Sequence, residues 1–265
     1  MSGIIELSPW ELSLAALLVI ALAVVCRQLQ LGVGGRLLWS AARTVIQLSL
    51  IGFVLKALFA SSSPGWVLLM GMVMLLAAGR EVRARQKNRL RGMWSYGTGW
   101  GAMFISSFAV AVLALTVMIG PEPWYAPRYA IPLLGMLMGN TMNGLSLSLN
   151  HLTQNVRSHR AVIETRLALG QTKSEAIVDI RRESVRTGLI PIINSMAAAG
   201  LVSLPGMMTG QILAGNSPMD AVKYQILIMF LIAGGTGFGT LSAVWMTSHR
   251  LFDKRHRLRL DRLEE

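Results

Sequence analysis

The chain has 265 residues, of which 53% are hydrophobic and only 14% charged, and its formal net charge is +12. Soluble domains carry about 25% charged residues, so this composition excludes an ordinary soluble fold and predicts a single membrane domain over residues 1–265. The one cysteine, Cys26, excludes a disulfide framework and a cysteine metal site.

Seven apolar runs approach the roughly 20 helical residues that cross a bilayer. They cover residues 8–27, 38–59, 64–80, 98–119, 129–150, 189–213 and 224–246. The predicted fold class is therefore all-α, a polytopic membrane protein with about seven transmembrane helices. Six spans remain an alternative, because the third run is short and the second contains charged residues.

Basic residues are concentrated in four of the connecting segments. The segments around 27–36, 80–97, 151–188 and 247–265 hold nearly all of the 25 lysine and arginine residues. Because these residues accumulate on the cytoplasmic side of membrane proteins, we expect the N-terminus outside and the C-terminus in the cytoplasm. The positive charge then reflects topology and contact with membrane lipid, and we expect no nucleic-acid partner.

Arg43 and Gln47 form the nearest approach to a buried polar pair in the second span. Polar groups in hydrocarbon are costly and mark helix contacts or a substrate pathway. Both residues are pathway candidates. The alternative is that Arg43, one turn from the cytoplasmic end, extends its guanidinium to the interface.

Amides and methionines recur in the fifth and sixth spans. Asn140 and Asn143 lie three residues apart on one helical face, and Pro205 removes a backbone donor, which predicts a bend or break in the sixth span. The further pathway candidates are Asn140, Asn143, Asn194, Met207, Met208 and Gln211. The alternative is that these amides join helices and the methionines fill gaps; no metal site is assigned.

The segment 151–188 is the one substantial polar stretch, and it falls on the predicted cytoplasmic side. Its apolar residues follow helical spacing and predict an amphipathic helix: Val156, Ile163, Leu167, Ile177 and Ile180. Gly170 interrupts the pattern and predicts two helical pieces joined at a turn, with Thr172 or Ser174 capping the second. A surface helix lying on anionic lipid is an alternative interpretation.

Sequence motifs for nucleotide binding and catalysis are missing from the chain. No phosphate-binding loop of the form G-x-x-x-x-G-K-[ST] occurs, and neither does H-E-x-x-H. We therefore assign no catalytic residue, expect no enzyme activity and no bound cofactor in this chain, and expect any ATP and Mg²⁺ to be handled by a partner subunit.

Glu164, Gly170 and Ile180 are spaced in a way that resembles the EAA loop of ABC permeases, in part only, since Thr165 and Arg166 stand in place of its two alanines. The resemblance implies a short helix that docks on a separate ATP-binding subunit and passes its motion to the membrane helices. These three residues are the candidates for ATPase coupling.

Three strings of the membrane spans resemble the Fet-type iron-export ABC permease family: RTVIQLSLIGFVL at 43–55, MGNTMNGLSLSLN at 138–150 and SLPGMMTGQILAG at 203–215. The resemblance implies a permease homodimer with two FetA-like ATP-binding cassette subunits, a bacterial inner-membrane location, and export of iron. An ABC permease for an organic solute such as a nucleotide sugar, and an ATP-independent channel or carrier, remain alternatives.

Overall fold

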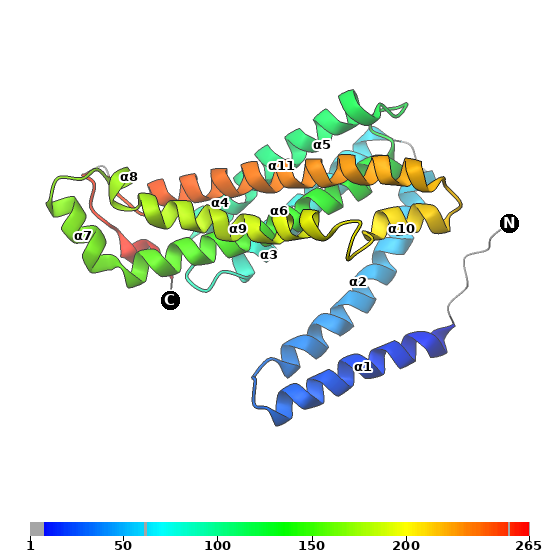
Figure 1. The fold of residues 1–265 in the computed structure, drawn as a ribbon, viewed down its shortest axis with the longest axis horizontal. Coiled ribbons are helices and arrows are strands. Elements are labelled where there is room, and N and C mark those ends of the chain that lie inside the picture. The colour runs from blue at the N-terminus through cyan, green and yellow to red at the C-terminus, as the bar shows by residue number, and fades with distance from the viewer. Residues whose placement is uncertain (1–7, 61–62, 254, 265) are drawn as a thin grey trace. The chain divides into compact units, whose positions relative to one another are not determined.

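The computed structural model describes residues 8–60, 63–253 and 255–264, and it is helical almost throughout (Figure 1). The predicted outer N-terminus, residues 1–7, lies outside the described residues. The elements are α1 (Pro9–Gln28), α2 (Gly34–Ala60), α3 (Pro64–Ala84), α4 (Met93–Met103), η1 (Phe104–Phe108), α5 (Ala109–Leu113), η2 (Ala114–Ile119), α6 (Pro127–Ser158), α7 (Arg160–Ala168), α8 (Lys173–Ala176), α9 (Val178–Ala198), α10 (Gly206–Leu213), α11 (Pro218–Arg250) and η3 (Leu260–Arg262). The predicted all-α class is confirmed.

The chain folds as two compact units, residues 1–62 with 213–215, and residues 63–212 with 216–265. In the first unit, α1 and α2 pack as a helical hairpin. Ser8 begins α1 with a capping box, in which its backbone N–H donates to Glu11 Oε2 at 2.7 Å. Close approach near the connection depends on Gly34, where a Cβ would lie 3.0 Å from the Ala23 carbonyl oxygen.

The second unit is built around α6, which packs against α3, α9 and α11. Two glycines bring α6 and α9 into backbone contact. A Cβ on Gly144 would lie 2.9 Å from the Gly188 carbonyl oxygen, and a Cβ on Gly188 would lie 2.8 Å from the Gly144 carbonyl oxygen. Small residues permit this approach between membrane helices, where no hydrophobic effect drives association.

Five described helices are long and apolar enough to span a membrane: Pro9–Gln28, Gly34–Phe59, Pro64–Ala84, Tyr96–Ile119 and Pro218–Arg250. The third of these has 21 residues, so the expected short third span is in fact of spanning length. The fifth predicted span is present as the 32-residue α6, which is less apolar. The protein is a multi-pass membrane protein.

The sixth predicted span, 189–213, is not one helix. α9 begins earlier, at Val178, and ends at Ala198, and α10 starts only at Gly206. The intervening turn satisfies part of its own backbone, since Gly200 N–H donates to Ser203 O at 2.9 Å and Ser203 N–H donates to Ala198 O at 3.2 Å. The break predicted from Pro205 is confirmed, and it starts six residues before the proline.

The fourth span contains two π-helical stretches that the sequence did not predict, η1 and η2. η1 places Ser106 and Ser107 in the interior, where Ser107 Oγ donates to Thr141 Oγ1 of α6 at 3.3 Å. A widened turn often accompanies functional positions. Here it places the Ser107 hydroxyl against α6, while the Ser106 hydroxyl donates to Ala102 O of its own segment.

Candidate functional site

The predicted turn at Gly170 closes α7 with a complete Schellman motif. Gly170 has φ +89°, a left-handed conformation, and its N–H donates to Leu167 O at 3.0 Å while Gln171 N–H donates to Arg166 O at 3.1 Å. Glycine is favoured at this position because a Cβ is strained there. The predicted turn at Gly170 is confirmed, but 151–188 contains parts of four helices, α6 to α9, instead of two pieces.

Thr172 caps the next helix, α8. Its Oγ1 accepts from Glu175 N–H at 3.4 Å, and its own N–H donates to Glu175 Oε2 at 2.7 Å, which completes a capping box. The hydrogen bond from the Thr172 backbone holds the pKa of Glu175 below its usual value. Of the two predicted caps, Thr172 is therefore the one used.

The apolar stripe of 151–188 packs inside the protein. Its members, Val156, Ile163, Leu167, Ile177 and Ile180, join a cluster that we call the cytoplasmic cluster, after the side of the membrane predicted for this segment. Its other buried members come from three separate parts of the chain: Leu90, Leu152, Ala176, Val244, Leu251, Phe252 and Leu263. The alternative in which this stripe faces lipid is wrong, because the C-terminal segment covers it.

The C-terminal segment, residues 251–264, is held against its neighbours by backbone hydrogen bonds. Arg91 N–H donates to Arg262 O at 2.7 Å, and Glu264 N–H donates to Arg89 O at 2.7 Å. The Glu264 carboxylate also pairs with Arg89 and, at 3.7 Å, with Arg83. The Arg89 guanidinium is the main reason that the pKa of Glu264 lies below its usual value. Three segments predicted to share one side of the membrane thus meet at one end of the unit.

Of the three coupling candidates, two lie on the surface of this end. Glu164 is exposed and accepts from Arg160 Nε at 2.8 Å, and Gly170 is exposed at its turn. Ile180 is half-buried against the cytoplasmic cluster, so it packs beneath this surface and is not part of it.

Sequence reasoning missed Val162 and Leu169 as parts of this surface. They lie seven residues apart, with side chains 50% and 80% exposed. This spacing places both on one face of the α7 region, away from the buried Ile163. Both residues are apolar but fall outside the helical spacing of the buried stripe, and this was the sequence signal that could have identified them. The outward face of α7 is an apolar surface beside Gly170.

A cavity of about 430 Å³ lies at the other end of the second unit, between α6, α10 and α11. Two of the predicted pathway residues line it, Met207 and Gln211. Gln211 Oε1 is buried, with no hydrogen-bond partner among the described residues. An unpaired buried carbonyl oxygen costs free energy, so it marks a position where a ligand's donor or cation gains an interaction.

Other side chains of this cavity were not singled out from the sequence. The polar ones are Arg128, Tyr129, Asn216, Ser217, Asp220 and Tyr224. They lie near the ends of α6 and α11 that are opposite the basic segments, and this position was the only signal for them. Asp220 pairs with Lys223 at 3.2 Å. Amide, phenol, carboxylate and thioether groups therefore surround one volume.

The remaining pathway candidates do not line this cavity. Asn143 Oδ1 accepts from Arg85 Nη1 at 2.6 Å and thereby joins α6 to the end of α3, while Asn140 donates to Met136 O of its own helix at 2.9 Å. Asn194 is exposed on α9, and Met208 is half-buried on α10. Arg43 and Gln47 are exposed on α2 of the first unit.

Comparisons with known proteins agree with this architecture. Residues 9–252 match an uncharacterised protein family, UPF0014. The chain belongs to the UPF0014 family. The similarity to FetB of Escherichia coli confirms the predicted resemblance to Fet-type permeases.

Relatives from bacteria and plants match most of the chain. A UPF0014 membrane protein of Synechocystis is 42% identical over 226 residues, 85% of this chain and 86% of the relative. "Probable iron export permease protein FetB" of Escherichia coli is 34% identical over 261 residues, 96% of each chain. "Protein ALUMINUM SENSITIVE 3" of Arabidopsis thaliana is 32% identical over 245 residues, 92% of this chain and 88% of the relative. No solved structure matches.

Proposed function

We propose that this chain is the membrane permease subunit of an ABC exporter, driven by ATP hydrolysis in a separate ATP-binding cassette subunit. The observation that carries the proposal is the coupling segment 151–188. It presents Glu164, Gly170 and the apolar face of α7 outward, and it continues directly into α6 on one side and α9 on the other. A partner that moves α7 therefore moves two membrane helices.

The rigidity of the coupling segment supports this role. Arg166 Nη1 donates to Ala176 O and to Asp179 Oδ2, both at 3.2 Å, which ties α7 to α8 and α9 across the Gly170 turn. The cytoplasmic cluster fixes the inner face. Because packed elements shift as bodies rather than deform continuously, a force on the surface is delivered to the helices.

Iron is the proposed cargo, and the cavity at α6, α10 and α11 is the proposed outer end of its pathway. Support comes from the name of the Escherichia coli relative and from oxygen and thioether groups around Gln211. Alternating access in the dimer, biased by ATP in a FetA-like partner, would open this end in turn. We place the complex in the bacterial inner membrane with the basic end in the cytoplasm.

An organic solute is the second candidate cargo, because of the cavity's size and lining. A volume of about 430 Å³ lies within the range of small-molecule sites and exceeds the need of one bare ion. Arg128 and two tyrosines would contact an anionic solute. Iron as a chelate would use the same groups.

The deciding experiment measures ATP-driven uptake into inverted vesicles that contain the chain with and without the ATP-binding subunit. Radioactive Fe²⁺ and a nucleotide sugar are compared as cargo. We expect iron uptake only with both subunits and ATP. Uptake of iron without the ATP-binding subunit would refute the ABC assignment, and ATP-dependent uptake of only the sugar would refute iron.

Replacing Gly170 tests the coupling segment directly. Gly170→Leu forces a bulky residue into a left-handed conformation at the docking surface, so we expect loss of copurification with the ATP-binding subunit and at least a tenfold fall in transport. Gly215→Leu is the matched control, because Gly215 has φ +91° and open space around it but lies between α10 and α11. Equal copurification of both variants would show that α7 is not the docking site.

A further inference from the structure

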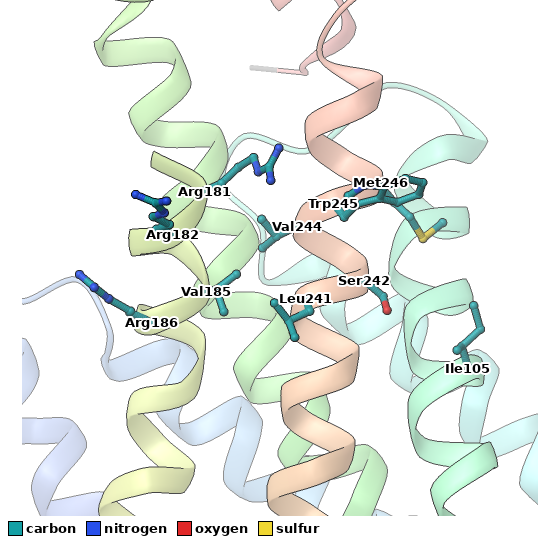
Figure 2. A pocket seen from close by; sticks show the side chains of 10 residues that line it. All are labelled: Ile105, Arg181, Arg182, Val185, Arg186, Leu241, Ser242, Val244, Trp245 and Met246. Atoms are coloured by element: carbon teal, nitrogen blue, oxygen red, sulfur yellow. The ribbon is translucent and has the colours of Figure 1, made fainter. Parts of the chain in front are cut away.

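A second and larger cavity, of about 750 Å³, opens between α9, η1 and α11 (Figure 2). Its lining comes entirely from the second unit: Ile105, Arg181, Arg182, Val185, Arg186, Leu241, Ser242, Val244, Trp245 and Met246. None of these residues was a pathway or coupling candidate. The cavity is separate from the one lined by Met207 and Gln211.

The lining has a cationic part and an apolar part. Arg181, Arg182 and Arg186 come from the first turns of α9. In Figure 2, Arg181 extends toward α11, whereas Arg182 and Arg186 extend from the other side of α9. Arg186 pairs with Glu183 at 3.4 Å, whereas Arg181 and Arg182 form no ion pair within the described ranges. At least two guanidinium groups therefore lack a carboxylate partner among the residues that the structure describes.

Apolar side chains continue from the arginines toward η1. Leu241 and Trp245 of α11 and Ile105 of η1 are all exposed at the surface of the groove. A small soluble anion would contact the arginines alone and leave this apolar part unused. An amphiphile with a negative head and hydrocarbon chains matches both parts.

The position of the groove along α11 fits a lipid headgroup. Trp245 lies five residues before Arg250, the last residue of α11, which is about 8 Å along the helix, and Leu241 lies about 14 Å along it. Tryptophan and arginine favour the membrane interface, where arginine reaches headgroups and leaves its stem in hydrocarbon. The arginines then lie at headgroup level and Ile105 and Leu241 at the level of the chains.

We propose that this groove binds an anionic phospholipid, whose headgroup phosphate is held by Arg181 and Arg182 and whose acyl chains lie along Leu241, Trp245 and Ile105. Basic pockets between membrane helices are established recognition sites for such headgroups. Arg181 N–H donates to Ile177 O at 2.9 Å, and Ile177 is buried in the cytoplasmic cluster. The bound lipid thus stabilises α9 at the point where the coupling segment joins it. Only the choice of the cytoplasmic leaflet rests on the proposed orientation.

The test measures lipid binding to the purified full chain in neutral micelles by native mass spectrometry, with phosphatidylglycerol, phosphatidylcholine and glycerol phosphate as probes. We expect phosphatidylglycerol to bind at least tenfold more tightly than the other two. Equal binding of the two phospholipids would refute charge recognition. Equal binding of glycerol phosphate and phosphatidylglycerol would reduce the groove to a phosphate site and overturn the lipid assignment.

Two variants assign the contacts. Arg181→Gln with Arg182→Gln should weaken phosphatidylglycerol binding about 25-fold, from the usual effect of two basic residues at an anionic lipid surface. Trp245→Ala should weaken it several-fold through lost apolar contact. Arg36→Gln with Arg255→Gln removes the same charge outside the groove and should change binding less than twofold. An equal loss in both double variants would mean that net charge, rather than this groove, binds the lipid.

The folding control is the melting temperature of each variant in phosphatidylcholine micelles, which we expect to equal that of the parent chain. If the Arg181 and Arg182 variant melts normally and still retains phosphatidylglycerol, the proposal is overturned. Addition of phosphatidylglycerol should raise the melting temperature of the parent chain and of the Arg36 and Arg255 variant only.

Discussion

The two ends of the α9–α10 segment differ in what surrounds them. At the end predicted to be cytoplasmic, Ile163, Ile177 and Leu251 are almost fully buried by other parts of the same chain. Within the break, Leu201 and Val202 are 90% and 86% exposed. Past it, no residue of α10 is buried as a whole. One end is thus folded by the chain's own contacts, whereas the other has few such contacts among the described residues. Stability and transport should therefore respond to different substitutions.

The largest expected effect comes from filling the contact between α6 and α9. Gly144→Leu places a side chain where even a Cβ would lie 2.7 Å from Thr236 Cγ2. We therefore expect the free energy of unfolding to fall by about 3 kcal/mol or more. Thermal unfolding in detergent measures it. Gly139→Leu, on the same helix with nothing near its Cβ position, is the control. If both variants melt alike, backbone contact does not hold the unit together.

The next effect tests whether the C-terminal segment belongs to the cytoplasmic cluster. Leu263→Ala removes a buried side chain and should lower the stability of the cytoplasmic cluster by about 2 kcal/mol. Hydrogen exchange of residues 85–92 and 160–180 should accelerate, while exchange in α10 stays unchanged. Leu213→Ala, at an exposed position of α10, is the control. Unchanged exchange in 160–180 would contradict the role given to the tail.

A smaller effect is expected at the cap of α8. Thr172→Ala removes one side-chain acceptor and should destabilise the local turn by about 1 kcal/mol. Faster exchange at the amide of Glu175, whose partner is Thr172 Oγ1, is the readout. Thr172→Ser keeps the acceptor and should behave as the parent chain; an effect of the same size in both would point away from capping.

The smallest effect is a pH dependence of the C-terminal segment. The Arg259 guanidinium lowers the pKa of Asp261 to about 2, and Arg89 lowers that of Glu264. Because both pKa values are depressed on folding, the stabilisation is complete above the unfolded values near 4 and is lost as the pH falls through the folded ones. Proteolysis at 251–264 should increase only in acid. Asp261→Asn should reduce this dependence, and an unaltered acid response would disprove it.

Local sequence signals were sufficient for much of the cytoplasmic element. Gly170 predicts the turn and Thr172 predicts the cap, because both depend on backbone conformation and hydrogen bonds within a few residues. Pro205 likewise predicts the nearby break in the helix. The partner of the stripe was not predictable in this way, because Leu263 lies about a hundred residues from Ile163 and no periodicity links them. Gln211 was found as a polar residue in a span, but the tyrosines around it required the arrangement of α6 and α11. The π-turns of η1 and η2 left no pattern in the residues.

The backbone contact of Gly144 with Gly188 has a mechanical consequence. Two helices that touch through their main chains have no intervening side chains that can shift when a force acts on them. We therefore expect α6 and the first half of α9 to move together as one rigid body that ends at α7. Beyond the glycine contact, Pro191 removes one backbone hydrogen bond of α9, and the helix ends at the turn 199–205, so bending is expected at these two places. A small rotation applied at α7 would therefore displace α10 at the cavity that Gln211 lines, by an amount that depends on the distance from the glycine contact to the turn.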